Sequence, residues 1–281
     1  MLHGQGHYLK VEGKDGPRRA LVHDPPGADG HALPLVLALH GTGGTGRIMA
    51  LLSGLNRLAD ERGFRVAYPQ ALGEPGTEDP AEGAAWNVAP GLGCPRHPEV
   101  DDVAFLGDVV ARVGRHAPID PQRIYVAGFS NGARMAYRMA LSAPWVAAIA
   151  AVAGTPVWDE APVRAVPTLA FHGTEDQHIP YQGGVGPLGR RFPALPAREA
   201  SARWAALMGC GEGPVRDTLE GHHRDLWFGG GCEAGLWTVA GMGHAWPGGR
   251  PYAPGADRPV QDLSAAHLIW AFFEAHPRET L

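Results

Sequence analysis

Short, continuous apolar runs recur along the chain, and most of them stop at a glycine. They lie at Leu33–His40 (LPLVLALH), 123–127 (RIYVA), 146–152, 168–172 (TLAFH) and 236–240 (LWTVA). Each run is shorter than a typical helix, and an apolar run without polar alternation is typical of a strand covered on both faces. The pattern therefore predicts a mainly parallel central sheet.

Between these runs, apolar residues recur at helical spacing. Helices are predicted at 48–62, around 103–113, at 131–141, at 197–208 and around 268–273. A further strand is predicted at 64–68 (FRVAY), and two pieces at 7–11 and 19–23 predict an antiparallel hairpin at the sheet edge. Strands that alternate with helices predict an α/β fold with right-handed crossovers and helices on both faces of the sheet.

Nothing in the pattern divides the chain into separate units. Residues 69–99 are rich in Gly, Pro and Glu and are predicted to form a long surface loop. There is no internal repeat and no break in composition, and 281 residues is a length that α/β folds reach as one unit. We expect a single domain over residues 1–281.

Charge and hydropathy exclude two classes of partner. The formal net charge is −5 with no block of five like charges, whereas nucleic-acid binding needs a basic stripe. No apolar run approaches the ~20 residues that span a bilayer. Met1–Lys10 (MLHGQGHYLK) also lacks the pattern of a secretory signal. We expect no nucleic-acid partner and no membrane span, and the sequence leaves the oligomeric state open.

The pentapeptide Gly128–Gly132 (GFSNG) lies between a predicted strand and a predicted helix. In that context G-x-S-x-G forms a nucleophile elbow, a strained turn that presents the serine hydroxyl. By itself the motif is weak, because a plain glycine-rich turn would look the same. The flanking strand and helix favour Ser130 as a nucleophile.

A serine hydroxyl needs a general base, and the base needs an orienting acid. His244 follows the strand 236–240 in a glycine-lined loop, and Asp176 follows the strand 168–172. Glu175 is a rival for the acid and Asp159 a more distant one. The order Ser, Asp, His is the one that accompanies the nucleophile elbow. Three other histidines are expected to be structural: His172, His178 and His267.

A developing oxyanion needs backbone N–H donors. The loop His40–Thr45 (HGTGGT) follows the first strand and suggests the N–H of Thr42, and the N–H of Asn131 follows the nucleophile. A phosphate-binding loop is the competing interpretation, but G-x-x-x-x-G-K-[ST] is absent. No cofactor and no metal is expected in the mechanism.

Taken together, these segments resemble the polyhydroxybutyrate depolymerase and feruloyl esterase family, carbohydrate esterase family 1 and its relatives. The matching segments are LALHGTGG (37–44), AWNV (85–88), VDDVAFL (100–106), RIYVAGFSNGARMAY (123–137), FHGTEDQHIPY (171–181) and GMGHAWPGG (241–249). The resemblance implies an α/β-hydrolase fold and a serine esterase with the triad Ser130, Asp176 and His244.

Three cysteines, Cys94, Cys210 and Cys232, allow three pairings, and their spacing also permits three free thiols. A bond between Cys210 and Cys232 would close a loop of about 22 residues, worth roughly 3 kcal/mol. The family resemblance implies that this pair is a disulfide and that the protein is exported. Relatives often carry a paired cysteine near Trp86 and Asn87, whereas only Cys94 is present here, so we expect Cys94 to be free. Because disulfides persist in oxidising compartments, an extracellular or periplasmic location is expected over a cytoplasmic one.

Aromatic residues in predicted loops bear on the substrate. Trp86, Trp246 and Trp227 could offer faces to a sugar or phenolic group, although structural packing is an equally good explanation. Asp101 and Asp102 stand at a predicted helix start and are interpreted as helix-stabilising charges rather than an acid site.

The expected function is hydrolysis of a carboxylic ester through an acyl-enzyme, on feruloyl, acetyl or short hydroxyalkanoate esters. A polyester depolymerase is the alternative, and no polymer-binding module is visible, which favours soluble substrates. A serine peptidase of the same fold and a non-catalytic carbohydrate-binding protein remain as alternatives from other classes. The presence of nucleophile, acid, base and oxyanion loop in order argues against the latter.

Overall fold

The computed structural model describes residues 5–28, 30–73, 82–89, 99–156, 161–186 and 193–279. Within them, one sheet has the strand order β1-β2-β4-β3-β5-β6-β7-β10-β9-β8. The strands are β1 (Gln5–Gly13), β2 (Gly16–Asp24), β3 (Leu33–Leu39), β4 (Arg65–Pro69), β5 (Ile119–Phe129), β6 (Ile149–Val152), β7 (Thr168–Gly173), β8 (Glu212–Leu219), β9 (His222–Gly229) and β10 (Cys232–Val239). The helices are α1 (Gly46–Ser53), α2 (Leu55–Arg62), α3 (Asp102–His116), α4 (Asn131–Ser142), α5 (Ala197–Leu207) and α6 (Ala265–Ala275).

The centre of the sheet is parallel and its two edges are antiparallel. Strands β4, β3, β5, β6, β7 and β10 pair in parallel, and β1 with β2 form the predicted N-terminal hairpin. The prediction of an α/β fold with a mainly parallel sheet and an N-terminal hairpin is confirmed. At the other edge β8, β9 and β10 pair antiparallel, which the apolar pattern did not predict.

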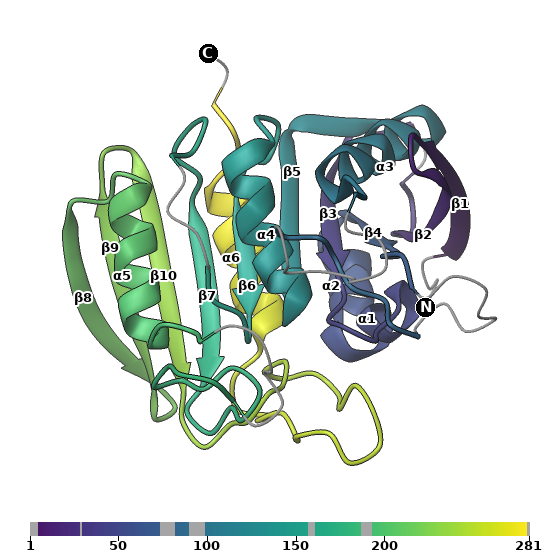
Figure 1. The fold of residues 1–281 in the computed structure, drawn as a ribbon. Helices are drawn as coiled ribbons and strands as arrows, with labels where there is room; N and C mark the ends of the chain where they lie inside the picture. The colour runs from purple at the N-terminus through teal and green to yellow at the C-terminus, as the bar shows by residue number, and fades with distance from the viewer. Residues whose placement is uncertain are drawn as a thin grey trace.

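Helices cover both faces of the sheet, as Figure 1 shows, with α4 and α5 on one face and α6 on the other. The alternation along β3 explains the two layers. Leu35, Leu37 and Leu39 belong to the core under α3, α4 and α5, whereas Val36 and Ala38 belong to the core under α1, α2 and α6. Side chains of a strand point alternately to the two faces, so an unbroken apolar run fills both cores.

One predicted helix, 48–62, is two helices in the structure. Gly54 separates α1 from α2 with φ 71°, a left-handed conformation that ends a helix and that glycine adopts without a steric penalty. The continuous helical spacing on both sides of Gly54 concealed the break.

The four loops that carry the sequence motifs lie at the same end of the strands. They follow β3, β5, β7 and β10, which run parallel, so the carboxyl ends of these strands lie on one side of the molecule. Ligand-binding groups collect at the carboxyl ends of the strands in open α/β sheets.

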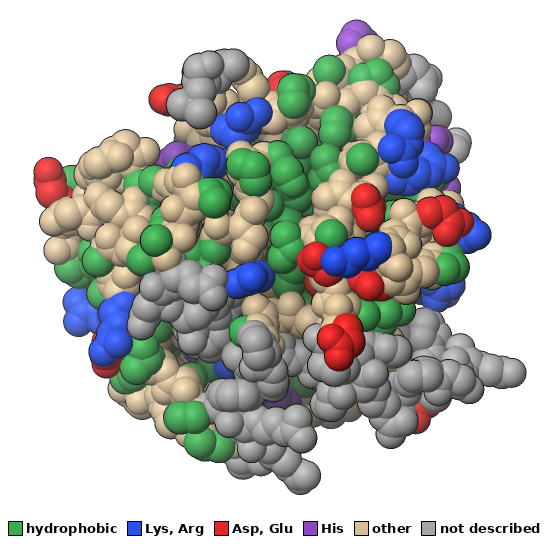
Figure 2. All heavy atoms as spheres, turned by 45° about the horizontal axis from the view of Figure 1, so that its top comes forward, with side chains coloured by type: hydrophobic (Ala, Val, Ile, Leu, Met, Phe, Trp, Pro, Cys, Tyr) green, Lys and Arg blue, Asp and Glu red, His purple; other side chains and the backbone are tan. Residues whose placement is uncertain are grey.

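None of the helices in the described part of the chain is long and apolar enough to cross a membrane. On the face shown in Figure 2, Lys and Arg side chains lie among Asp and Glu rather than in one basic field.

Trp270 of α6 offers a test of the second core. Its indole stacks on Phe64 with ring centroids 3.9 Å apart, and it is 4% exposed. Trp270→Ala should lower the free energy of unfolding by about 3–5 kcal/mol, because it removes buried area and leaves a cavity. Trp270→Phe keeps an aromatic ring, and the indole N–H it removes has no partner, so it should cost less than about 1.5 kcal/mol. Urea denaturation of both variants measures the difference, and equal costs would contradict this account.

Candidate active site

The turn between β5 and α4 holds Ser130 in a strained backbone conformation. Its φ of 57° and ψ of −117° lie where residues other than glycine are rarely found. Such a conformation costs of the order of 1–3 kcal/mol and persists only when the surroundings impose it. Here the Ser130 N–H donates to the carbonyl of Val152 at 2.9 Å, and α4 begins at the next residue. This is the backbone that the G-x-S-x-G motif predicts.

Close packing around the turn explains why position 132 of the motif is glycine. A Cβ atom on Gly132 would collide with the carbonyl oxygens of Leu39 and His40, at the end of β3. The nucleophile turn therefore lies directly against the strand that carries the candidate oxyanion loop. A Cβ on Gly41 would lie 3.0 Å from the Cβ of Ser130, which places this loop beside the serine.

The structure brings Asp176 and His244 together. His244 Nδ1 lies 2.7 Å from Asp176 Oδ2, although 68 residues separate the two in sequence. Both side chains are buried, and the other oxygen, Asp176 Oδ1, accepts the N–H groups of His178 at 2.8 Å and Ile179 at 2.9 Å. Both carboxylate oxygens therefore accept hydrogen bonds, and these bonds hold the carboxylate in its orientation toward the imidazole.

The charge of Asp176 follows from these contacts. Burial opposes its ionisation, but the hydrogen bond and attraction of His244, together with the N–H of Ile179, outweigh burial and hold its pKa below the usual value. His172 donates from Nε2 to the carbonyl of Ile179 at 2.7 Å, and burial lowers its pKa, so it is neutral. Asp176 is therefore an anion that binds His244 and orients its ring.

The rival acids do not take this position. Glu175 is exposed, and its contact with the His244 loop is made by its backbone N–H, which donates to the carbonyl of Met242 at 2.9 Å. Asp159 lies outside the described residues. His267, predicted to be structural, is exposed and contacts Ser264.

His244 lies beside the nucleophile turn. Its ring centroid is 4.9 Å from that of Phe129, the residue before Ser130. Among the described residues, no hydrogen bond joins the Ser130 hydroxyl to His244. Catalytic hydrogen bonds are often loose until substrate binds, and the adjacent positions leave the pair able to form one.

Sequence reasoning missed a residue that fixes the His244 backbone. Asp257 Oδ2 accepts the N–H of His244 at 2.6 Å. A Cβ on Gly243 would collide with the same carboxylate, so the glycine makes room for it. Asp257 lies in a loop without periodicity or motif, and no sequence signal marks it.

His40 holds the loop that follows β3. Its Nε2 accepts the N–H of Ala71 at 3.1 Å, so the proton is on Nδ1, which donates to the carbonyl of Gly41 at 2.8 Å. Burial lowers the pKa of His40 to about 4, so this neutral tautomer persists at neutral pH. The imidazole therefore fixes the first peptide of the loop.

The two predicted oxyanion donors are available. In the loop, the N–H of Gly43 donates to Ala84 and that of Gly44 to Gly41, whereas the N–H of Thr42 has no partner among the described residues. Asn131 is the first residue of α4, where backbone N–H groups lack partners within the helix. Neither N–H thus donates to a protein acceptor in the described part of the chain, and their role as oxyanion donors stays a prediction.

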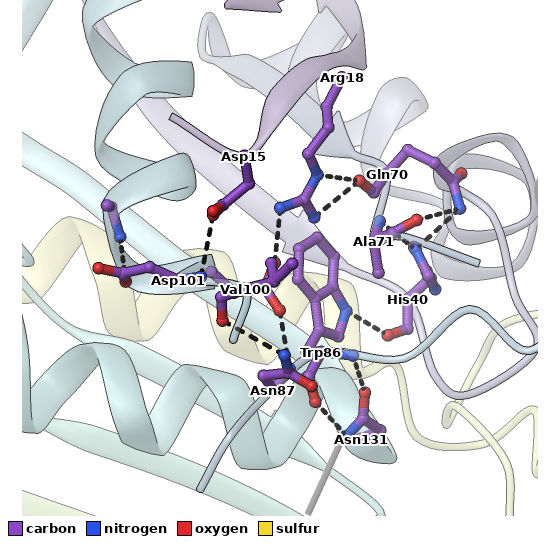
Figure 3. Close-up of polar contacts among 12 residues, drawn as sticks. Asp15, Arg18, His40, Gln70, Ala71, Trp86, Asn87, Val100, Asp101 and Asn131 are labelled. Atoms are coloured by element: carbon purple, nitrogen blue, oxygen red, sulfur yellow. Dashed lines mark hydrogen bonds and ion pairs between the residues drawn. The ribbon is translucent and has the colours of Figure 1, made fainter. Parts of the chain in front are cut away.

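Trp86 connects the two sides of this site, as Figure 3 shows. Its indole N–H donates to the carbonyl of His40 at 2.9 Å. Its backbone N–H donates to Asn131 Oδ1 at 2.7 Å, and Asn131 Nδ2 donates back to its carbonyl at 3.2 Å. The prediction that Trp86 contacts substrate is wrong for this structure, because its side chain is 0% exposed and serves as this connection.

Trp246 is corrected in the same way. Its indole is 1% exposed and packs in the core under α1, α2 and α6. Neither tryptophan therefore offers a face to a ligand, and their size and apolar area explain their burial. Trp227 is 6% exposed and also belongs to the core.

A buried ion pair lies behind Trp86. Arg18 donates to Asp102 Oδ1 at 2.7 Å and twice to the carbonyl of Gln70, and its guanidinium stacks on Phe105 at 3.4 Å. Burial works against both charges, lowering the pKa of Arg18 and raising that of Asp102. Asp102 Oδ2 also accepts the N–H of Asn87 at 2.7 Å, next to Trp86.

Asp101 and Asp102, both predicted to stabilise the start of a helix, have different contacts in the structure. Asp101 caps α3, its side chain accepting the N–H of Ala104 at 2.9 Å. Asp102 is 2% exposed and pairs with Arg18, a partner from β2 that helix position alone could not identify.

Cys210 and Cys232 are buried free thiols in the structure, close enough for each to affect the pKa of the other. The structure does not join them in the predicted disulfide. Burial raises the pKa of Cys232 to about 12. Cys94 lies outside the described residues.

Elsewhere in the described part of the chain, one group has metal-ligand chemistry. His7, Asp24 and His116 place one ligand atom each within 4.8 Å of one another. Asp24 also pairs with Arg65, whose charge opposes a cation at that position.

Comparison with known proteins identifies the family. The model of the family described as esterase PHB depolymerase matches residues 19–172, more than half of the chain. The chain belongs to this family. The chain is also similar to an esterase-named relative, NocK of Nocardia uniformis subsp. tsuyamanensis, with 33% identity over 264 residues that cover 83% of this chain and 72% of NocK.

Two further proteins are similar to this PHB depolymerase family member. Feruloyl esterase B of Piromyces equi is 30% identical over 240 residues, covering 81% of this chain and 42% of that protein, so the chain spans less than half of it. The solved acetyl xylan esterase from Aspergillus awamori has a TM-score of 0.66 at 16% identity, with 96% and 99% of the two chains covered. The second likeness shows the α/β-hydrolase fold, and the relatives show that the chain is an esterase.

Asp176→Asn should lower the kcat for para-nitrophenyl acetate by several orders of magnitude, because an amide presents the wrong partner to His244 Nδ1. Glu175→Gln is the matched control and should stay within about twofold, since this side chain is exposed. Steady-state kinetics on both variants decides between them. A reversed pattern would make Glu175 the orienting acid.

Trp86→Phe should lower kcat about tenfold with little change in KM, because the His40 carbonyl loses its indole donor, worth about 1–1.5 kcal/mol. Trp246→Phe is the control, since its indole N–H has no partner. The same steady-state assay compares the two variants. Equal losses of kcat would show that aromatic packing, rather than this hydrogen bond, supports the site.

Proposed function

We propose that this esterase acts through Ser130, with His244 as general base and Asp176 as the orienting acid. The observation that carries the proposal is the 2.7 Å contact of His244 with a buried, ionised Asp176. It occurs beside a serine with a strained, positive-φ backbone at the carboxyl edge of the sheet. A nucleophile, a base and an acid in this arrangement can perform acyl transfer.

In the first half of the reaction, Ser130 Oγ attacks the ester carbonyl carbon and its proton passes to His244 Nε2. The carbonyl oxygen becomes an oxyanion that accepts hydrogen bonds from the N–H groups of Thr42 and Asn131. Collapse breaks the bond to the alcohol oxygen, which takes the proton from His244 and leaves.

In the second half, water attacks the acyl-enzyme and gives its proton to His244. The new oxyanion collapses, Ser130 Oγ departs and recovers that proton, and the free acid leaves. Every proton that His244 takes is returned within the same half reaction. No step requires a cofactor or metal, so we expect full activity after dialysis against a chelator.

The acyl group is the finer part of the proposal. Relatives named feruloyl esterase B and acetyl xylan esterase support feruloyl or acetyl esters on plant polysaccharide as substrates. The family description supports a second candidate, short hydroxyalkanoate esters or their polymer. In both classes the scissile bond is a carboxylic ester, so the same residues would serve.

A substrate panel tests the proposal. Methyl ferulate, para-nitrophenyl acetate, a 3-hydroxybutyrate dimer and polyhydroxybutyrate particles should separate the candidates by kcat/KM, and we expect the feruloyl or acetyl ester to rank first. Ser130→Ala should abolish labelling by a fluorophosphonate probe and lower turnover by several orders of magnitude. Faster turnover of a matched peptide para-nitroanilide would instead indicate a peptidase. Glycan binding without labelling would indicate a binding protein.

We also propose that the protein is exported and that Cys210 and Cys232 are joined there. Support comes from their adjacency, at the start of β10 and after α5, and from the stability such bonds have in oxidising compartments. Titration of the denatured, unreduced protein should count one reactive thiol of the three cysteines. A count of three in protein recovered from outside the cytoplasm would remove the disulfide.

A further inference from the structure

A second histidine covers the ring of the proposed base. The imidazole of His178 stacks on that of His244, with ring centroids 4.5 Å apart and planes inclined by 23°. His178 lies in the loop after β7, two residues beyond Asp176, and His244 lies in the loop after β10. Two parallel strands thus deliver both rings to one place. The sequence offered only a structural role for His178.

The backbone of His178 has a separate function from its ring. Its N–H donates to Asp176 Oδ1 at 2.8 Å, and this bond does not depend on the side chain. A Cβ on the neighbouring Gly186 would collide with the His178 carbonyl, so the main chain is held from that side also. Substitution of the side chain therefore changes the ring that faces His244 and leaves the support of Asp176 in place.

The charges around the two rings favour a neutral His178. Partial burial and then the positive charge of His244 lower its pKa, against the weaker attraction of Asp176 and Asp257. Among the described residues, the titratable groups whose charges act on it are His244 and Asp257 from the segment after β10, and Asp176 from its own loop. Coupling between two sites is mutual, so a cation at His178 also opposes a cation at His244.

We propose that His178 is a positioning residue that supports catalysis in its neutral form by stacking on His244 and stops supporting it when protonated. The inference rests on the proposed function, because each acyl transfer passes a proton from Ser130 Oγ to His244 and creates an imidazolium. When His178 is neutral, the imidazolium of His244 stacks on a polarisable, uncharged ring. When His178 is protonated, the imidazolium of His244 is repelled by a second positive charge, on a ring whose centroid is 4.5 Å from its own.

The consequence is a distinct pH dependence. His178 has its pKa below the usual 6.5, so the effect appears as pH falls through the range below that value. The proposed base must be unprotonated to act, and protonation of His178 adds a second loss of activity. The acid limb of log kcat/KM, which reports the free enzyme, should therefore have a slope above one per pH unit over the range in which His178 takes up its proton, because a single protonation gives a slope of one.

The experiment uses the full chain and para-nitrophenyl acetate over the acid limb. His178→Phe keeps an aromatic ring over His244 and removes the titration, so its slope should fall to about one. His178→Ala removes the ring as well, so it should share that slope and show a kcat lower than that of His178→Phe by several fold. His31→Phe, at an exposed histidine before the amino-terminal end of β3, is the control and should keep the wild-type slope.

The outcomes separate the inference from the proposed function. A wild-type slope of about one, or an unchanged slope in His178→Phe, would overturn the role of His178 while leaving the triad in place. A kcat for His178→Phe no higher than that of His178→Ala would overturn the stacking part. Turnover that persists in Ser130→Ala would instead overturn the proposed function. Circular dichroism and fluorophosphonate labelling of each variant show that the fold and the nucleophile are intact.

Discussion

The backbone conformation of Ser130 is the constraint on which the candidate site depends. A residue with a side chain has positive φ there only because β5, α4 and the end of β3 approach too closely to allow another path. That approach needs glycine at 132 and at 41, where a Cβ would meet neighbouring backbone or Ser130 itself. The strain of the turn is balanced by the burial of the two apolar cores that press these elements together.

Support for the oxyanion loop extends well beyond the loop. Neutral His40 fixes the Gly41 peptide, Trp86 joins the His40 carbonyl to Asn131, and Asp102 holds the adjacent N–H of Asn87. Arg18 completes the network through the Gln70 carbonyl. A buried ion pair is costly to desolvate and contributes little net stability by itself. Its value here lies in fixing two loop segments whose backbone atoms lead directly to the proposed donors.

The base is held in a comparable manner. His244 is fixed at its ring by Asp176 and at its backbone by Asp257, and its ring is flanked by Phe129 and His178. Asp176 is buried and acts on the imidazole, whereas the exposed Asp257 accepts the backbone N–H of His244. The ring and the main chain of His244 are thus held by different carboxylates, so one contact can be altered while the other is kept.

The sequence by itself determined the sheet, most helices and the order of the candidate triad, because apolar runs and glycine-bounded loops are local signals. It located Ser130, Asp176 and His244 through the strand end that precedes each one. It missed the β8–β9 hairpin, in which β8 is exposed along its whole length, and the break at Gly54. Tertiary structure alone decided which residues meet: that Trp86 and Trp246 are buried, that Asp102 pairs with Arg18, and that His178 covers His244. These facts depend on contacts between segments far apart in the chain, and residue type and spacing do not encode such contacts locally.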